Sequence, residues 1–143
     1  MEASEIMTAQ HLWVCGENTD AQETAQLMCD HDIGAVPVLD SAGRLEGMIT
    51  DRDLACRVLA AGRSFATPVR EIMSTPPYFV REDADLKEVE AIMRDHKVRR
   101  VPVVDDQDHL KGMISLADLV HYCYSSPEEH GLVGVVEAIS TPD

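Results

Sequence analysis

The sequence contains an internal repeat, and this repeat limits the possible fold more than any other feature. When the chain is shifted by 65 residues, the stretch 14–54 aligns with 79–119 without a gap and gives 16 identical residues in 41 positions. Unrelated sequences of ordinary composition would share about three. The longest identical blocks are Val36-Pro37-Val38 with Val101-Pro102-Val103 and Gly47-Met48-Ile49 with Gly112-Met113-Ile114. The chain is therefore a duplicated unit.

Each copy predicts the same order of elements, namely strand, helix, strand, strand and helix. In the second copy Leu86, Val89 and Met93 recur at helical spacing, which indicates an amphipathic helix. Runs of β-branched residues favour the strands, and the last strand of each copy runs directly into a helix that begins at Thr50 or Ser115. The expected strands are 11–15, 35–39 and 45–49 in the first copy and 77–81, 100–104 and 110–114 in the second.

The repeat predicts boundaries at 4–62 for the first copy and 67–124 for the second, with a C-terminal extension over 125–143. Between the copies, Thr67-Pro68 is expected to cap a short helix that has proline at its first position and runs through Ile72. A half of about 60 residues is marginal alone. We therefore expect an α/β (α+β) module in which two pseudo-symmetric halves pack through their sheets, with a cleft along the seam.

In the C-terminal extension, Leu132, Val136 and Ile139 fall on one face of a predicted helix, with Val133 and Val135 beside it. A short apolar stripe beyond a complete repeat is expected to cover the protein's own sheet or a partner subunit.

Composition excludes several classes of function. The net charge is −14, which disfavours nucleic acid as a partner because phosphate contacts supply most of that affinity. No apolar run approaches the length of a membrane span, and Met1–Glu5 has neither the basic nor the apolar part of a secretory signal. We therefore expect a cytoplasmic protein without a membrane partner.

The cysteines and histidines show no metal or redox pattern. The four cysteines form no CxxC pair, so we expect free thiols. His31 and His96 occupy matched positions, but their neighbours offer no recurrent ligand spacing, and no metal site is predicted. No nucleophile stands beside a base in a recognisable motif. We expect a protein that is not an enzyme and needs no catalytic cofactor.

The most informative motif is Gly-x-x-(Thr/Ser)-x-x-Asp, which occurs at Gly47–Asp53 and Gly112–Asp118. In both copies it lies where a strand ends and a helix begins. The N-terminus of a helix offers unpaired N–H groups and a positive dipole end, which suit a phosphate. The hydroxyl can donate to a phosphate oxygen, and the aspartate can accept from ribose hydroxyls. The same residues also fit a plain capping box, and duplication alone does not separate the two interpretations.

These motifs, the Val-Pro-Val strands and the Met-x-x-His stretches before them (Met28–His31 and Met93–His96) resemble a tandem pair of cystathionine-β-synthase (CBS) domains, a Bateman module. The resemblance covers roughly residues 4–124. It implies adenosyl ligands (AMP, ADP or ATP, in some members NAD(H) or S-adenosylmethionine) in two clefts between the repeats. Bateman modules commonly pair into dimers, so the resemblance also implies a homodimer.

The resemblance assigns the hydroxyl to the phosphate and the aspartate to the ribose, giving Thr50 with Asp53 and Ser115 with Asp118. The adenine would lie against residues of the opposite repeat. By position these are Met7, Thr8, Ile33 and Gly34 for the Ser115/Asp118 site, and Met73, Ser74, Val98 and Arg99 for the Thr50/Asp53 site.

The two expected sites differ in their cations. Arg99 and Arg100 stand before the second Val-Pro-Val, where the first copy has Gly34 and Ala35. The resemblance implies that a basic residue here reaches the phosphates held by its own repeat, so the Ser115/Asp118 site is expected to bind phosphate more strongly. A solvated strand edge is the alternative for both arginines. Arg52, which matches a neutral residue of the second copy, is a candidate cation for the first site.

Two functional hypotheses follow. In the first, the chain is an energy or redox sensor whose geometry changes with the bound nucleotide and is recognised by a regulated protein. In the second, it is an interaction and dimerisation module whose ligand sites are vestigial.

Overall fold

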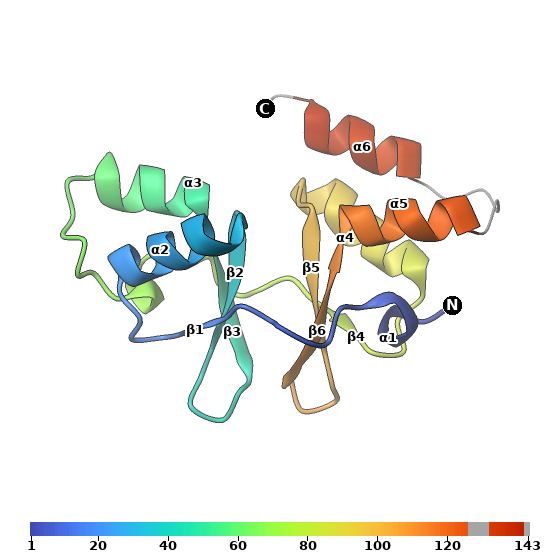
Figure 1. The fold of residues 1–143 in the computed structure, drawn as a ribbon, viewed down its shortest axis with the longest axis horizontal. Coiled ribbons are helices and arrows are strands. Elements are labelled where there is room, and N and C mark those ends of the chain that lie inside the picture. Colours follow the sequence, from blue (N-terminus) through green and yellow to red (C-terminus); the bar gives the residue numbers. More distant parts are fainter. Residues whose placement is uncertain (126–131, 142–143) are drawn as a thin grey trace. The chain divides into compact units, whose positions relative to one another are not determined.

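The computed structural model describes residues 1–125 and 132–141, and the chain divides into two compact units (Figure 1). Unit 1 consists of Met1–Leu12 and Tyr78–Asp143, and unit 2 consists of Trp13–Pro77. These units are not the same as the sequence repeats, because the segment that precedes each repeat packs on the other one. The repeat boundaries at 4–62 and 67–124 stay a prediction. Part of the extension, 126–131 and 142–143, lies outside the described residues.

Unit 2 contains a three-stranded sheet in the order β1-β2-β3, with β1 parallel to β2 and β2 antiparallel to β3. Its strands are β1 (Cys15–Gly16), β2 (Ala35–Leu39) and β3 (Leu45–Thr50). Its helices are α2 (Ala21–His31), α3 (Asp51–Leu54), the π-helical turn η1 (Ala55–Leu59) that continues α3, and the short 3₁₀ helix η2 (Val69–Glu71).

Unit 1 repeats this plan with the sheet order β4-β5-β6 and the same pattern of parallel and antiparallel pairs. Its strands are β4 (Val80–Arg81), β5 (Arg100–Val104) and β6 (Leu110–Ser115). Its helices are α1 (Ala3–Ile6), α4 (Leu86–His96), α5 (Leu116–Ser125) and α6 (Leu132–Ser140). Among the residues that the structure describes, no helix is long and apolar enough to span a membrane.

The expected order of elements is confirmed, but the first strand of each repeat is shorter than 11–15 or 77–81. β1 pairs only with Val38 and Leu39, and β4 pairs only with the equivalent two residues of β5. The preceding residue of the central strand is Pro37 or Pro102. Proline has no N–H to donate, so the ladder with the first strand ends there.

The linker differs from the prediction at its cap. Pro68 is the N-cap residue of η2 and not its first helical residue, and it lies outside the helix with ψ 145°. The hydroxyl of Thr67 does not cap η2, because it donates to the carbonyl of Ser64 at 2.6 Å. The helix is also shorter than expected and ends at Glu71.

Each sheet is extended by a segment from outside its own repeat. In unit 1 the N–H of Thr8 donates to the carbonyl of Met113 at 2.8 Å, and the N–H of Met113 donates back to Thr8 at 3.0 Å. In unit 2 the N–H of Ser74 donates to the carbonyl of Met48 at 2.8 Å, and the return bond is 3.1 Å. The segment before the first repeat thus completes the second sheet, and the linker completes the first.

Helix α6 packs on the second repeat (Figure 1). Among the side chains of α6 that the structure describes, Val135 is buried, with 0% exposure. It lies in the core that also holds Val89 and Met93 of α4. The face expected from Leu132, Val136 and Ile139 is therefore only partly correct. Ile139 packs against this core, but Val136 is 43% exposed, and the side chain of Leu132 lies outside the described part. The buried face of the helix thus includes Val135, which the sequence placed beside the stripe, because Val135 packs into the core with residues of α4.

Candidate functional site

Thr50 and Asp53 form a capping box where β3 runs into α3. Thr50 has an extended backbone, with φ −115° and ψ 163°, which is the usual N-cap conformation. Its Oγ1 accepts from the N–H of Asp53 at 3.0 Å, and its own N–H donates to Asp53 Oδ2 at 2.9 Å. The two side chains therefore hold each other's backbone at the start of the helix.

Ser115 and Asp118 form the same arrangement where β6 runs into α5. The N–H of Ser115 donates to Asp118 Oδ2 at 2.8 Å, and the N–H of Asp118 donates to Ser115 Oγ at 3.1 Å. Both Ser115 and Asp118 are half-buried. The duplicated motif thus forms two sites of matching local geometry, one in each unit.

The capping box leaves binding capacity in both motifs. The hydroxyl uses its oxygen as an acceptor and keeps a hydrogen that it can donate. The carboxylate uses Oδ2 for the cap, and Oδ1 can accept a further hydrogen bond. Helix capping and ligand contact are therefore compatible in the same side chains.

The glycine that opens each motif permits the close approach of the added segment. A Cβ on Gly47 would lie 2.6 Å from Met73 Sδ and 2.9 Å from the carbonyl oxygen of Ser74. A Cβ on Gly112 would lie 2.6 Å from Met7 Sδ and 2.9 Å from the carbonyl oxygen of Thr8. Glycine is thus needed here for packing, whether or not a ligand binds.

In unit 2 the structure brings four of the predicted residues near Thr50. Ser74 pairs with Met48 through two backbone hydrogen bonds, and Met73 precedes it in the chain. Both Met73 and Ser74 are half-buried. The carbonyl of Gly34 accepts from the N–H of Asp51 at 3.0 Å, which sets Ile33 and Gly34 beside the start of α3.

In unit 1 the corresponding residues lie near Ser115. The carbonyl of Arg99 accepts from the N–H of Leu116 at 2.7 Å, which sets Val98 and Arg99 beside the start of α5. Met7 and Thr8 join the same unit through the bridge between Thr8 and β6. The prediction that Ile33 and Gly34 serve the Ser115/Asp118 site, and Val98 and Arg99 the other, stays a prediction, since these residues belong to different units.

Arg100 lies directly across the sheet from Ser115. The two residues are register partners in the antiparallel pair β5–β6, and partners of this kind present their side chains on the same face. The equivalent partner of Thr50 is Ala35. A cation therefore stands opposite the hydroxyl in the second motif, and a methyl group stands there in the first.

Arg57 is a cation beside Asp53 that was not predicted from the sequence. Its Nε lies 3.8 Å from Asp53 Oδ1, and its Nη1 donates to the carbonyl oxygens of Ile72 and Met73. The i, i+4 spacing from Asp53 was the available signal. Arg52, the candidate that the sequence suggested, is exposed on the first turn of α3.

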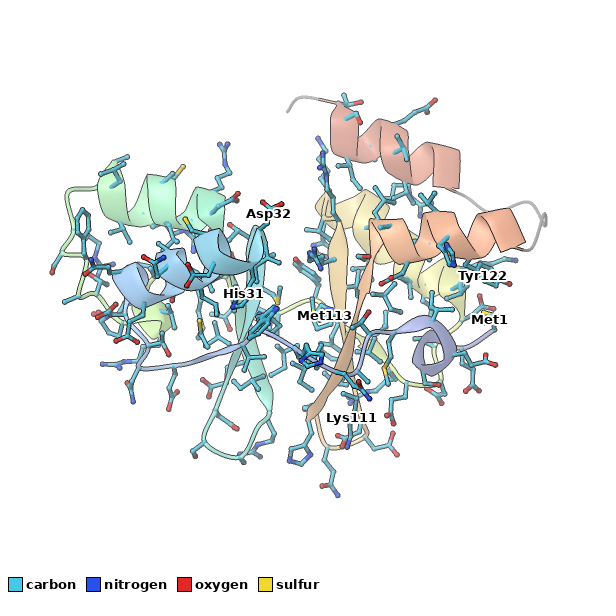
Figure 2. The ribbon with its side chains drawn as sticks, in the orientation of Figure 1. Met1, His31, Asp32, Lys111, Met113 and Tyr122 are labelled. Carbon is cyan, nitrogen blue, oxygen red and sulfur yellow. The ribbon has the colours of Figure 1, made fainter. Side chains whose placement is uncertain are left out.

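The two histidines at matched positions, His31 and His96, each stack on an aromatic ring. His31 lies on Trp13 with ring centroids 3.5 Å apart, and His96 lies on Tyr78 at 5.2 Å. Figure 2 shows His31 at the end of α2. Within residues 1–125 and 132–141, no group of three or more His, Cys, Asp or Glu side chains is placed to hold a metal ion.

Comparison with known proteins identifies the family. A model of the CBS domain matches residues 3–59 and 69–125. The CBS domain-containing protein YhcV of Bacillus subtilis is 43% identical over 115 residues, which is 80% of this chain and 80% of YhcV. Hypoxic response protein 1 of Mycobacterium tuberculosis is 38% identical over 141 residues, which is 98% of this chain and 94% of that protein.

Two solved structures share the fold. The crystal structure of Hypoxic Response Protein I with two coordinated zinc ions has a TM-score of 0.77 at 37% identity and covers 85% of this chain and 98% of that one. The CBS domain pair of protein MJ0100, in complex with 5′-methylthioadenosine and S-adenosyl-L-methionine, has a TM-score of 0.75 at 26% identity and covers 87% of this chain and 97% of that one. With the duplicated sheet-and-helix unit and the two family matches, these likenesses show that the chain belongs to the CBS-domain family and carries two CBS domains in tandem.

Proposed function

We propose that this CBS pair is a regulatory module that binds an adenosyl ligand at Thr50/Asp53 and at Ser115/Asp118. The ligand class is AMP, ADP or ATP, with NAD(H) and S-adenosylmethionine as further candidates. The observation that carries the proposal is the duplicated pair of hydroxyl and carboxylate at a helix start, with one hydroxyl hydrogen and one carboxylate oxygen that the cap does not use. The adenosyl ligands of the MJ0100 pair support the ligand class.

The regulatory output follows from differential affinity. A ligand shifts an equilibrium between two geometries only if it binds one of them better. We propose that occupancy changes the geometry of the module or of a homodimer, and that a regulated protein recognises the change. In this scheme the module senses the energy or redox state through the ligand it holds.

The second repeat is the stronger phosphate site in this proposal. Arg100 faces Ser115 across β5 and β6, and Arg99 adjoins the start of α5. A hydrogen bond from a charged group contributes about 1.5–3 kcal/mol, which corresponds to roughly tenfold or more in affinity.

The second candidate is an interaction and dimerisation module with vestigial sites. The capping boxes favour it, because Thr50 and Ser115 already have a structural role at the start of each helix. The two candidates differ in whether any adenosyl compound binds.

Calorimetric titration with AMP, ATP, NADH and S-adenosylmethionine tests the proposal. Asp53→Asn and Asp118→Asn keep an acceptor oxygen for the cap but remove the charge, and each should weaken binding at its own site roughly tenfold. Asp51→Asn, on an exposed carboxylate of the same turn as Asp53, is the matched control and should bind as the wild type does. If none of the four compounds binds or raises the melting temperature, the interaction module replaces the sensor.

Replacing Arg100 tests the ranking of the sites. Arg100→Gln should weaken ATP roughly tenfold at the Ser115/Asp118 site and leave adenosine almost unchanged, since adenosine has no phosphate. An equal loss for both compounds would contradict the role of Arg100 as a phosphate contact.

A further inference from the structure

We propose that Arg57 is a positioning residue that couples the Asp53 carboxylate to the linker segment 72–75, so that engagement of this carboxylate loosens the linker from β3. The inference rests on the proposed function only for the molecule that engages Asp53. The coupling itself concerns residues of unit 2 alone.

One guanidinium contacts both partners. Arg57 Nη1 donates to the carbonyl oxygen of Ile72 at 2.9 Å and to that of Met73 at 3.2 Å. Its Nε lies 3.8 Å from Asp53 Oδ1. Because the guanidinium is a rigid planar fork, its position relative to the carboxylate also fixes its position relative to the two carbonyls.

The segment held by Arg57 is the one that extends the first sheet beside β3. Directly after Met73, Ser74 exchanges two backbone hydrogen bonds with Met48, and the hydroxyl of Thr75 donates to the carbonyl of Glu46 at 3.1 Å. The strand β3 that receives these bonds ends at Thr50. The candidate site and the linker are therefore the two ends of one connected group of contacts.

The carboxylate has one oxygen for two uses. Asp53 Oδ2 accepts from the N–H of Thr50, so Oδ1 faces Arg57 and is also the atom that a ribose hydroxyl would use. The side chain of Asp53 is 12% exposed and that of Arg57 is 49% exposed. The guanidinium is thus the more solvent-accessible partner, and a ligand that takes Oδ1 competes with it.

The second repeat provides an internal control. The residue equivalent to Arg57 is Tyr122 on α5 (Figure 2), which carries no positive charge for Asp118. The added segment is nevertheless bonded in the same way, through Thr8 and Met113. Loss of the guanidinium should therefore affect the pair Ser74 and Met48 without affecting the pair Thr8 and Met113.

Amide hydrogen exchange measured by NMR on the ligand-free full chain tests the coupling. Arg57→Gln should speed the exchange of the Ser74 and Met48 amides roughly tenfold and leave Thr8 and Met113 at the wild-type rate. Asp53→Asn should speed the same two amides by a smaller factor, and the double variant should be no faster than Arg57→Gln alone. Arg57→Lys should restore only part of the protection, because an ammonium group lacks the fork.

Arg52→Gln is the matched control, since Arg52 is an exposed arginine next to Asp53 in the sequence, and it should change neither pair. Equal acceleration of both pairs in Arg57→Gln would mean general destabilisation and would overturn the proposal. Fully additive effects of Asp53→Asn and Arg57→Gln would overturn it too, because independent sites add.

A second measurement adds AMP. In the wild type, AMP should speed the exchange of the Met48 amide, which donates to Ser74 and is not an expected adenine contact, and in Arg57→Gln AMP should cause no further change. If AMP binds at Asp53 and the Met48 rate stays constant or falls, the coupling is wrong. If AMP binds nowhere, the proposed function loses this ligand, and the ligand-free set of variants decides the coupling.

Discussion

At matched positions the first repeat has Ala35 and Arg57 where the second has Arg100 and Tyr122. In the first repeat the cation comes from the helix after the carboxylate and is bonded to carbonyls of the linker. In the second it comes from the neighbouring strand and faces the hydroxyl. The backbone contacts that build the two sites are the same. Duplication has therefore preserved the backbone of the site while its charges have diverged, and the two sites are not chemically equivalent.

The largest effect is expected where the repeats are most alike. Gly47→Ala and Gly112→Ala each place a methyl group against a methionine sulfur and a backbone carbonyl. The side chain can move, but the carbonyl moves only with its segment. Each variant should lose about 1–3 kcal/mol of unfolding free energy in urea.

Gly16→Ala is the control for this pair, because its nearest contact, Thr19 Oγ1, would lie 3.8 Å away. Exchange of Ser74 should increase only in Gly47→Ala and exchange of Thr8 only in Gly112→Ala. A variant that loosens both segments equally would show that the two sheets are not completed separately.

A smaller effect is expected at the hairpin loops. The N–H of Arg44 donates to Asp40, and with the Ala42 N–H and the Arg44 guanidinium it holds the pKa of Asp40 below its ordinary value of 3.8. A carboxyl with a lowered pKa in the folded state stabilises the fold above its unfolded pKa, and this contribution is lost as the pH falls through the folded value. The free energy of unfolding should therefore decrease as the pH falls below about 4. This decrease should be less steep in Asp40→Asn than in the wild type.

Asp105 is the matched residue of the second loop. Its partial burial acts to raise its pKa, but hydrogen bonds from the N–H groups of His109 and Gln107, with the charges of His109 and Lys111, lower it overall. In acid unfolding followed by circular dichroism, the free energy of unfolding of Asp105→Asn should also fall less steeply with decreasing pH than that of the wild type. If either variant keeps the wild-type slope below about pH 4, the loop carboxylate is not a source of the pH dependence.

The smallest effect is expected from exchanging core residues between the repeats. Cys15 and Thr24 are buried and lie 3.4 Å apart from Sγ to Oγ1, and burial raises the pKa of the Cys15 thiol. The second repeat has Val80 and Val89 at these positions. Replacing both polar partners by apolar groups is close to neutral. Thr24 Oγ1 also donates to the carbonyl of Asp20 at 2.9 Å, but this carbonyl still accepts from the Thr24 N–H in the variant. Cys15→Val with Thr24→Val should therefore stay within about 1 kcal/mol of the wild type in urea unfolding. A larger loss would show that the two cores pack differently.

The sequence predicted the parts of the fold that local pattern controls. Strands β2 and β5 have the expected bounds, and β3 and β6 extend one residue further, to the capping residues Thr50 and Ser115. These two residues belong to the sheet as well as to the helix, since Thr50 pairs with Ala35 and Ser115 with Arg100. A dual role of this kind is not visible from periodicity.

The sequence did not predict features that depend on distant partners. The contacts of Arg57 with Ile72 and Met73 join residues 15 and 16 positions apart, and no spacing rule indicates such a pair. The burial of Val135 depends on its packing against Val89 and Met93 of α4, which lie more than 40 positions earlier in the chain. Both follow from tertiary packing, which local pattern does not encode.

Each sheet is completed by a segment from outside its own repeat, and this has a consequence for the order of folding during synthesis. Unit 2 is continuous in the chain, from Trp13 to Pro77, whereas unit 1 needs Met1–Leu12 together with Tyr78–Asp143. Domains made on the ribosome generally fold in the order in which they emerge. Unit 2 can therefore fold while unit 1 is still being made. The residues around Thr8 leave the ribosome before unit 2 and find their partner on β6 only after β4 and β5 have emerged as well.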